Sequence, residues 1–119
     1  MINYGVGSNS NTVYCDIDGT LIIWPGGKGG STKIAKREKL SPKINNIVVD
    51  ILKSEKSKGS TIILWSAGGK EHCKWSAEFC GITNIVDVYL RKPNIFIDDN
   101  HKWISNKRRT YINQDGLIL

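Results

Sequence analysis

The sequence has no apolar run that approaches the roughly 18 residues needed to span a membrane, and its N-terminus lacks the charged start and apolar core of a secretory signal. It has only three cysteines, an odd number without a C-x-x-C pair. A disulfide framework and a zinc site are therefore both unexpected. The two histidines, His72 and His101, have no His or Cys partner at metal-ligand spacing and are expected to be ordinary side chains. These absences favour a protein of the reducing cytoplasm that makes no membrane contact.

The composition is that of one small globular domain. The chain has 119 residues, of which 39% are apolar and 24% charged. This length allows a single core, which we place in residues 13–119 behind a flexible lead-in at residues 1–12. Lys and Arg number 17 against 11 Asp and Glu, a net charge of +6. A basic excess favours phosphates, nucleic acid or an anionic surface as partners.

Buried strands are predicted from short apolar, β-prone runs. The first begins at Val13 and ends near Asp16, and the second, TIILW, ends at Ser66. Two more are expected at residues 85–90 and 95–97, and a terminal strand or hairpin at residues 111–119. The Gly-rich segment 24–37 is expected to be a loop.

Two helices are predicted between these strands. Ser41-Pro42 has the pattern of an N-cap followed by a first helical residue, an apolar stripe follows, and Gly59 is the expected stop. A second helix is expected over residues 70–80, ended by Gly81. Its Cys73 and Cys80 are expected to face the core. Strands that alternate with helices predict an α/β fold, three-layered and Rossmann-like, with a mostly parallel central sheet.

Acidic and hydroxyl side chains stand where the predicted strands end: Asp16, Asp18, Ser66, Asp98 and Asp99. In a parallel sheet these strand ends line one crevice. Four carboxylates repel one another unless a cation offsets their charge, and all-oxygen ligands favour Mg²⁺. Backbone N–H groups around Gly19, and around Ala67-Gly68, are candidate phosphate donors.

These segments resemble the motifs of the haloacid dehalogenase (HAD) superfamily of phosphatases. Asp16-Ile17-Asp18-Gly19-Thr20 is similar to the first motif, TIILWS to the second and IFIDD to the fourth, in the right order. The resemblance implies that Asp16 is the nucleophile, Asp18 the general acid and base, and Ser66 a ligand of the phosphoryl oxygens. Gly19, Thr20, Ala67 and Gly68 would line the substrate. Mg²⁺ would be held by Asp16, the Asp18 carbonyl and Asp98, with Asp99 acting directly or through water.

The third motif of that superfamily is a Lys, and Lys92 is the best match. A fully extended fourth strand would start roughly 15–20 Å from the site, so Lys70 and Lys102 are kept as alternatives.

No lid domain fits between the motifs. Only 45 residues separate Thr20 from Ser66, and 31 separate Ser66 from Asp98. The resemblance is therefore to a capless member, whose open site admits a large substrate or is covered by a partner subunit. Basic residues crowd residues 28–43 and 102–109, and Trp24 and Trp103 beside them could stack on bases, whereas Trp65 and Trp75 are assigned to the core. A nucleotide or a nucleic-acid terminal phosphate is the candidate substrate.

Two rival functions stay open. The first is a non-catalytic basic module that binds nucleic acid and keeps a vestigial site. The second is a phosphoacceptor receiver domain, although no isolated Asp follows TIILW where that class needs its phosphorylated residue.

Overall fold

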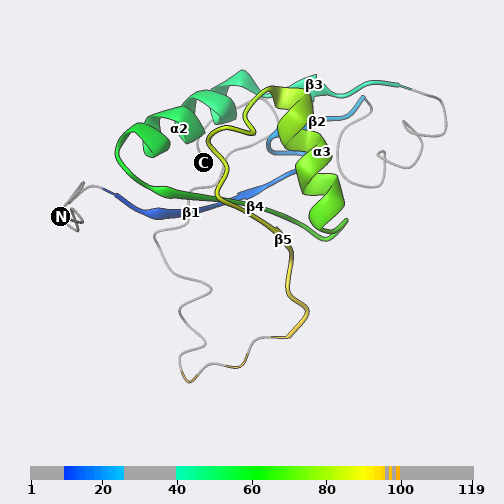
Figure 1. The fold of residues 1–119 in the computed structure, drawn as a ribbon. Helices are drawn as coiled ribbons and strands as arrows, with labels where there is room; N and C mark the ends of the chain where they lie inside the picture. The colour runs from blue at the N-terminus through cyan, green and yellow to red at the C-terminus, as the bar shows by residue number, and fades with distance from the viewer. Residues whose placement is uncertain (1–9, 26–39, 96, 98, 100–119) are drawn as a thin grey trace.

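The structure is a computed structural model that describes residues 10–25 and 40–95, together with Ile97 and Asp99. Its centre is a parallel sheet of three strands, β1 (Thr12–Asp16), β4 (Thr61–Ser66) and β5 (Val88–Arg91), in the order β1-β4-β5 (Figure 1). The register pairs Asp16 with Trp65, and Ser66 with Arg91. All three strands therefore end at the same edge, which fixes where the site is built.

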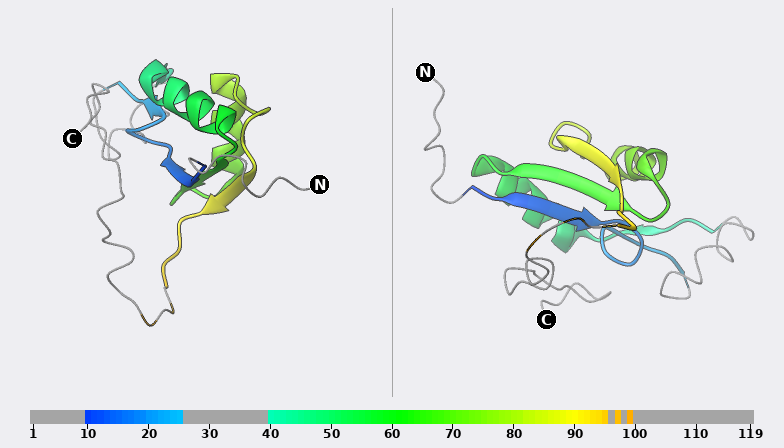
Figure 2. Two further views of the ribbon diagram at one scale, coloured as in Figure 1. Left: turned by 90° about the vertical axis from the view of Figure 1, so that its left-hand side faces the viewer. Right: turned by 90° about the horizontal axis from the view of Figure 1, so that it is seen from below.

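Helices α2 (Asn46–Ser57) and α3 (Lys70–Cys80) cover one face of this sheet (Figures 1 and 2). Each helix connects two adjacent parallel strands, and the chain advances across the sheet in one direction, so both helices pack on the same face. The α/β class and the parallel sheet are as predicted. In the part of the chain that the structure describes, no helix has the length and apolar character of a membrane-spanning segment.

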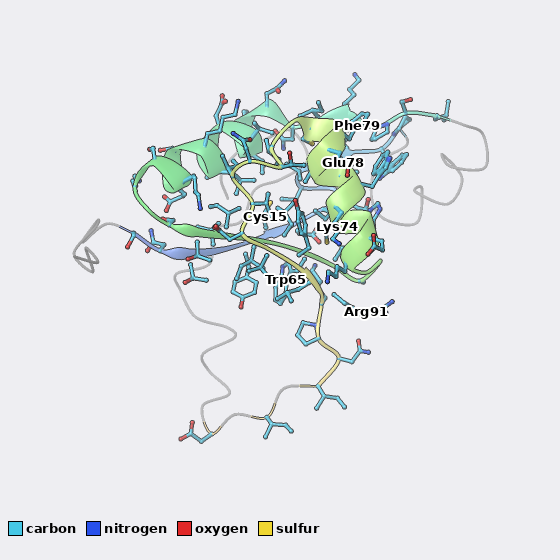
Figure 3. All side chains as sticks on the ribbon, in the orientation of Figure 1. Cys15, Trp65, Lys74, Glu78, Phe79 and Arg91 are labelled. Atoms are coloured by element: carbon cyan, nitrogen blue, oxygen red, sulfur yellow. The ribbon has the colours of Figure 1, made fainter. Side chains whose placement is uncertain are left out.

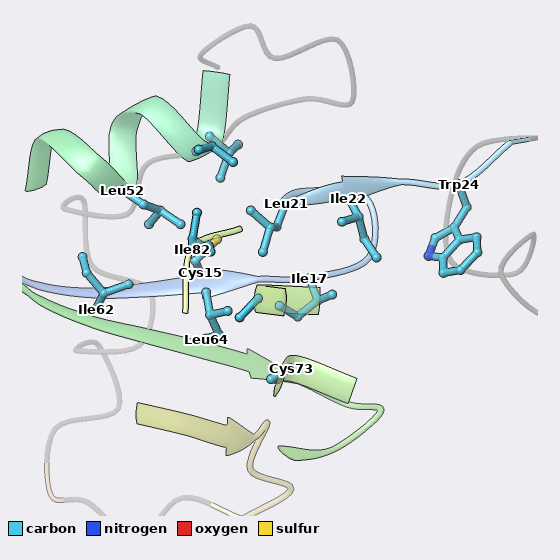
Figure 4. Close-up of a cluster of buried hydrophobic side chains, with 13 residues drawn as sticks. Cys15, Ile17, Leu21, Ile22, Trp24, Leu52, Ile62, Leu64, Cys73 and Ile82 are labelled. Atoms are coloured by element: carbon cyan, nitrogen blue, oxygen red, sulfur yellow. The ribbon is translucent and has the colours of Figure 1, made fainter. Parts of the chain in front are cut away.

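The core lies between the helices and the sheet (Figure 4). It is formed by alternate residues of the strands, by one side of each helix and by the loop after β1. Its most deeply buried members include Ile17, Ile62, Leu64, Leu52, Cys73, Ala77 and Ile82. The prediction that Cys73 is a core side chain is confirmed.

The first helix starts later than the sequence pattern predicts. Lys43–Ile44 form β3, which pairs antiparallel with β2 (Ile22–Ile23). Asn45 then donates its backbone N–H to Leu21 O at 2.9 Å and its side-chain amide to Thr20 O at 3.0 Å. These tertiary bonds hold the segment extended, so Ser41-Pro42 is not the helix start and α2 begins at Asn46.

The predicted helix ends are confirmed. The residues that follow α2 and α3 include Gly59 and Gly81, with φ of 88° and 69°. Glycine adopts this left-handed conformation without steric cost, which is why it ends a helix well. At the other end of the chain, β1 begins at Thr12, and Asn11 before it donates to Ser60 Oγ at 2.8 Å. The described fold therefore includes Asn11 and Thr12, which were predicted to belong to the flexible lead-in.

The prediction of a strand at residues 95–97 is wrong at Ile95 and Ile97, the two of these residues that the structure describes. Ile95 and Ile97 lie outside any strand and are 78% and 96% exposed. Residues 92–95, which follow β5, run away from the sheet (Figure 1). Within residues 10–25 and 40–95, no helix covers the second face of the sheet, so the third layer is not seen there. The expected terminal element at 111–119 and most of the basic segments lie outside the described residues.

Candidate active site

The carboxyl ends of the three parallel strands bring together Asp16, Ser66 and Lys92. Lys92 directly follows β5, and its backbone N–H donates to Ser66 O at 3.0 Å. Its ammonium lies 2.8 Å from Asp16 Oδ1. The predicted separation of 15–20 Å was wrong because Lys92 directly follows the third strand of the sheet and does not begin a fourth. Of the alternatives, Lys70 is exposed at the start of α3, and Lys102 lies outside the described residues.

Asp16 is oriented from two sides and remains accessible. Thr20 Oγ1 donates to Asp16 Oδ2 at 3.2 Å, while Lys92 contacts the other carboxylate oxygen. The Lys92 ammonium also lies 5.8 Å from the ring centroid of Trp65, a cation–π distance. Side-chain exposure is 34% for Asp16 and 39% for Lys92, so a ligand from solvent can reach both.

Asp18 is held by two ring nitrogens. Trp24 Nε1 donates to Asp18 Oδ1 at 2.7 Å, and His72 Nε2 lies 3.0 Å from both carboxylate oxygens. An ionised Asp18 accepts a hydrogen bond from a protonated Nε2, and a protonated Asp18 donates to a bare Nε2. His72 can therefore hold this carboxyl group in either protonation state.

The sequence reasoning missed His72, and it misplaced two tryptophans. His72 is 54 positions from Asp18, and no local pattern signals their contact. Trp24 is only 4% exposed and belongs to the core, whereas Trp75 is 42% exposed and lies on the surface. Proximity to a Gly-rich loop was a poor guide to the exposure of Trp24, because its indole is fixed by the bond to Asp18.

Ser66 sits in a tight turn between β4 and α3. It is 3% exposed, and its Oγ accepts the Gly68 N–H at 2.9 Å. A Cβ on residue 68 would come within 3.3 Å of both Ser66 Oγ and the His72 ring, so glycine allows this close approach. Because Oγ acts as acceptor in that bond, the hydroxyl hydrogen can be donated to a ligand.

Most of the backbone N–H groups expected to bind phosphate are already bonded within the protein. Gly19 donates to Ile22 O at 2.8 Å, and Thr20 donates to Ile17 O at 3.1 Å. Gly68 donates to the Ser66 hydroxyl. These three are therefore not open donors in this conformation. Ala67 is exposed, and its N–H has no acceptor within the described part of the chain.

The expected metal ligands are only partly placed. Asp98 lies outside the described residues, and Asp99 is exposed beyond the end of β5. Among the residues that the structure describes, no three His, Cys, Asp or Glu side chains gather at one point. The Asp16 carboxylate and the main chain at Asp18 supply oxygen donors of the kind that Mg²⁺ prefers. This part of the site fits a hard divalent cation, and further donors are needed to complete its coordination.

A thiolate nucleophile is excluded next to Asp16. Burial, reinforced by the charge of Asp16, raises the pKa of Cys15 to about 12. Burial likewise raises the pKa of Cys73 to about 11, against a weaker opposing effect of its bond to Leu90 O. Both side chains stay protonated at neutral pH, so neither offers a thiolate at this site.

No protein-family model matches the sequence, and searches of curated proteins and of solved structures return no match. The assignment of roles to these residues therefore rests on the geometry of this chain and on the motif resemblance.

Proposed function

We propose that this protein is a Mg²⁺-dependent phosphomonoesterase of the HAD superfamily that acts through Asp16. The observation that carries the proposal is the 2.8 Å contact between Lys92 Nζ and Asp16 Oδ1. It joins a candidate nucleophile to a cation at the carboxyl edge of a parallel sheet, which is the ligand-binding edge of α/β folds.

In the first step, an Asp16 carboxylate oxygen attacks phosphorus, and the bond between phosphorus and the substrate oxygen breaks. Asp18 gives its proton to the departing oxygen. Lys92 offsets the charge of Asp16 and of the incoming phosphate, and the Ser66 hydroxyl donates to a phosphoryl oxygen. In the second step, Asp18 takes a proton from water, which attacks the aspartyl phosphate and regenerates Asp16.

The charge balance of the site explains why a divalent cation is needed. Asp18 must be protonated for the first step, so the charges of Asp16 and Lys92 cancel and the site has no net positive charge to offset the incoming phosphate. Mg²⁺ bound by Asp16, the Asp18 carbonyl, Asp98 and Asp99 would supply the missing positive charge.

The proposed substrate is a phosphomonoester carried by a nucleotide or by a nucleic-acid end. Its support is the net charge of +6 and the absence of room for a lid domain between the motifs. The corresponding fold is a three-layer, Rossmann-like domain whose site is open to a large substrate or covered by a second subunit. A binding module with a vestigial site would retain the charge but not turnover.

The test is Mg²⁺-dependent phosphate release. Wild type is expected to hydrolyse p-nitrophenyl phosphate or 3′- and 5′-phosphorylated oligonucleotides in the presence of Mg²⁺. Hydrolysis should stop when EDTA removes the metal ion. Asp16→Asn removes the nucleophile and should lower kcat by at least about a thousandfold. Asp50→Asn, an exposed aspartate on α2, is the matched control and should retain activity. The proposal fails if wild type hydrolyses no phosphoester, or if Asp16→Asn is as active as wild type.

A further inference from the structure

Helix α3 distributes its side chains in an unusual way. The face that packs on the sheet carries small residues, Cys73, Ser76 and Ala77, all at 0% exposure. The two largest apolar side chains of the helix, Trp75 and Phe79, point outward and are 42% and 37% exposed. Folding alone favours the opposite arrangement, because burying large aromatic side chains contributes most to core stability.

These two rings belong to a row of near-parallel rings that we call the aromatic platform: Trp24, His72, Trp75 and Phe79. Trp75 stacks on each of the others, with centroid distances of 6.3 Å to Trp24, 6.0 Å to His72 and 5.3 Å to Phe79. The interplanar angles are 12°, 11° and 15°, as in offset stacking. Figure 3 shows Phe79 at the end of α3 that is farther from the carboxyl edge of the sheet.

The platform is continuous with the proposed catalytic site. His72 and Trp24 bond to Asp18 at one end of the row, and Phe79 lies at the other. From His72 to Phe79, the helix rises roughly 10 Å. The exposed rings of the platform therefore begin within one helical turn of His72, which contacts Asp18.

The charged side chains of α3 give it no net charge that would attract a ligand to the platform. Helix α3 carries Lys70 and Lys74 against Glu71 and Glu78, and Lys74 lies 3.7 Å from Glu71. The helix is thus formally neutral, so a ligand held here is held by ring stacking. A nucleobase is flat and aromatic and is attached to a phosphate, which matches a stacking surface beside a phosphate site.

We propose that the exposed rings of the aromatic platform, Trp75 and Phe79, bind the nucleobase next to the phosphate that is hydrolysed and so select nucleotide and nucleic-acid phosphomonoesters. This inference rests on the proposed phosphatase function. It assigns substrate selection to α3 and gives a binding role to Trp75, which the sequence analysis had assigned to the core.

The kinetic test compares substrates that differ only in the base. Thymidine 5′-monophosphate and phosphorylated oligothymidylates carry it, and 2-deoxyribose 5-phosphate lacks it. Trp75→Ala and Phe79→Ala should each lower kcat/KM for the base-containing substrates by about five- to a hundredfold. Hydrolysis of 2-deoxyribose 5-phosphate should change by less than about twofold, and Trp75→Tyr should recover most of the loss because it keeps a ring. Ile47→Ala removes a side chain of similar exposure, 46%, from α2 and is the matched control.

A binding measurement does not depend on turnover. Fluorescence anisotropy of a labelled, 5′-phosphorylated oligothymidylate should report binding to Asp16→Asn and weaker binding to Asp16→Asn with Trp75→Ala. Because stacking carries the interaction, the dependence of the dissociation constant on salt should have the same slope for both proteins. In the kinetic test, comparison of thymidine 5′-monophosphate with the phosphorylated oligothymidylates separates recognition of one base from recognition of a strand.

The two proposals fail in different ways. If the platform variants lose activity equally on all substrates, or on none, the platform inference is wrong and the phosphatase stands. If no phosphoester is hydrolysed, the phosphatase is wrong, and anisotropy decides the platform: equal binding with and without Trp75, or none, overturns it. If Trp75→Ala instead converts a dimer into a monomer in sedimentation and leaves base selectivity unchanged, the platform is a subunit contact and the inference is overturned.

Discussion

Replacing Lys92 with Met should separate catalysis from stability. The Lys92–Asp16 pair joins groups at 2.8 Å that are 39% and 34% exposed. Solvent screens such a pair, so its loss should change the free energy of unfolding by no more than about 1 kcal/mol. In the proposed mechanism, the same ammonium faces the transferring phosphoryl group in the transition state. Removing one preorganised charge there should lower kcat by about 100- to 1000-fold, or about 3–4 kcal/mol.

The chain contains a closely matched control. Lys56 lies 2.8 Å from Asp87 Oδ1, and the two are 34% and 36% exposed, but this pair is at the opposite end of β5. Lys56→Met should therefore match Lys92→Met in urea unfolding and retain wild-type phosphate release. Equal activity of the two variants would refute the role of Lys92. A loss of several kcal/mol of stability in Lys92→Met would mean that the lost activity reflects unfolding.

Three further outcomes test the fold. The hydrogen bond from Lys56, and then the bond from the Ile62 N–H, lower the pKa of Asp87 in the folded protein. The ionised Asp87 therefore stabilises the fold above the unfolded pKa of about 3.9, and this stabilisation is lost as pH falls through the lower folded pKa. The urea midpoints of wild type and Asp87→Asn should converge in that pH range. Native Cys15 should resist iodoacetamide at pH 8, because burial raises its pKa to about 12, and should react in urea. Leu52→Ala, at 1% exposure, should cost about 2–5 kcal/mol in urea unfolding, whereas Ile47→Ala should cost less than about 0.5.

Patterns confined to one segment predicted the local structure well. The apolar run TIILW became β4, and Gly81 ended α3 at the expected residue. The start of α2 was predicted wrongly because the pattern at Ser41-Pro42 is local, whereas the pairing of Ile44 with Ile22 is not. An apolar residue at helical spacing can equally be used in a short antiparallel ladder.

In the candidate site, too, the features that depend on local patterns were predicted and those that depend on tertiary contacts were not. The strand ends identified Asp16, Asp18 and Ser66, since the period of buried strands is visible in the sequence. The contact of His72 with Asp18 was invisible, because it depends on how the first turn of α3 packs over the loop after β1. Tertiary packing of this kind leaves no fixed spacing in a single sequence.

The position of β5 has a consequence for the proposed activity. Among the described residues β5 is one of the two edge strands of the sheet; it is only four residues long, and most of its side chains are exposed. Such a segment opens at a lower free energy than the core strands. Its departure would carry Lys92 away from Asp16, a contact between residues 76 positions apart, while β1 and β4 remain paired. Mild denaturant should therefore inactivate the protein before it unfolds, so that activity reports on the docking of one strand.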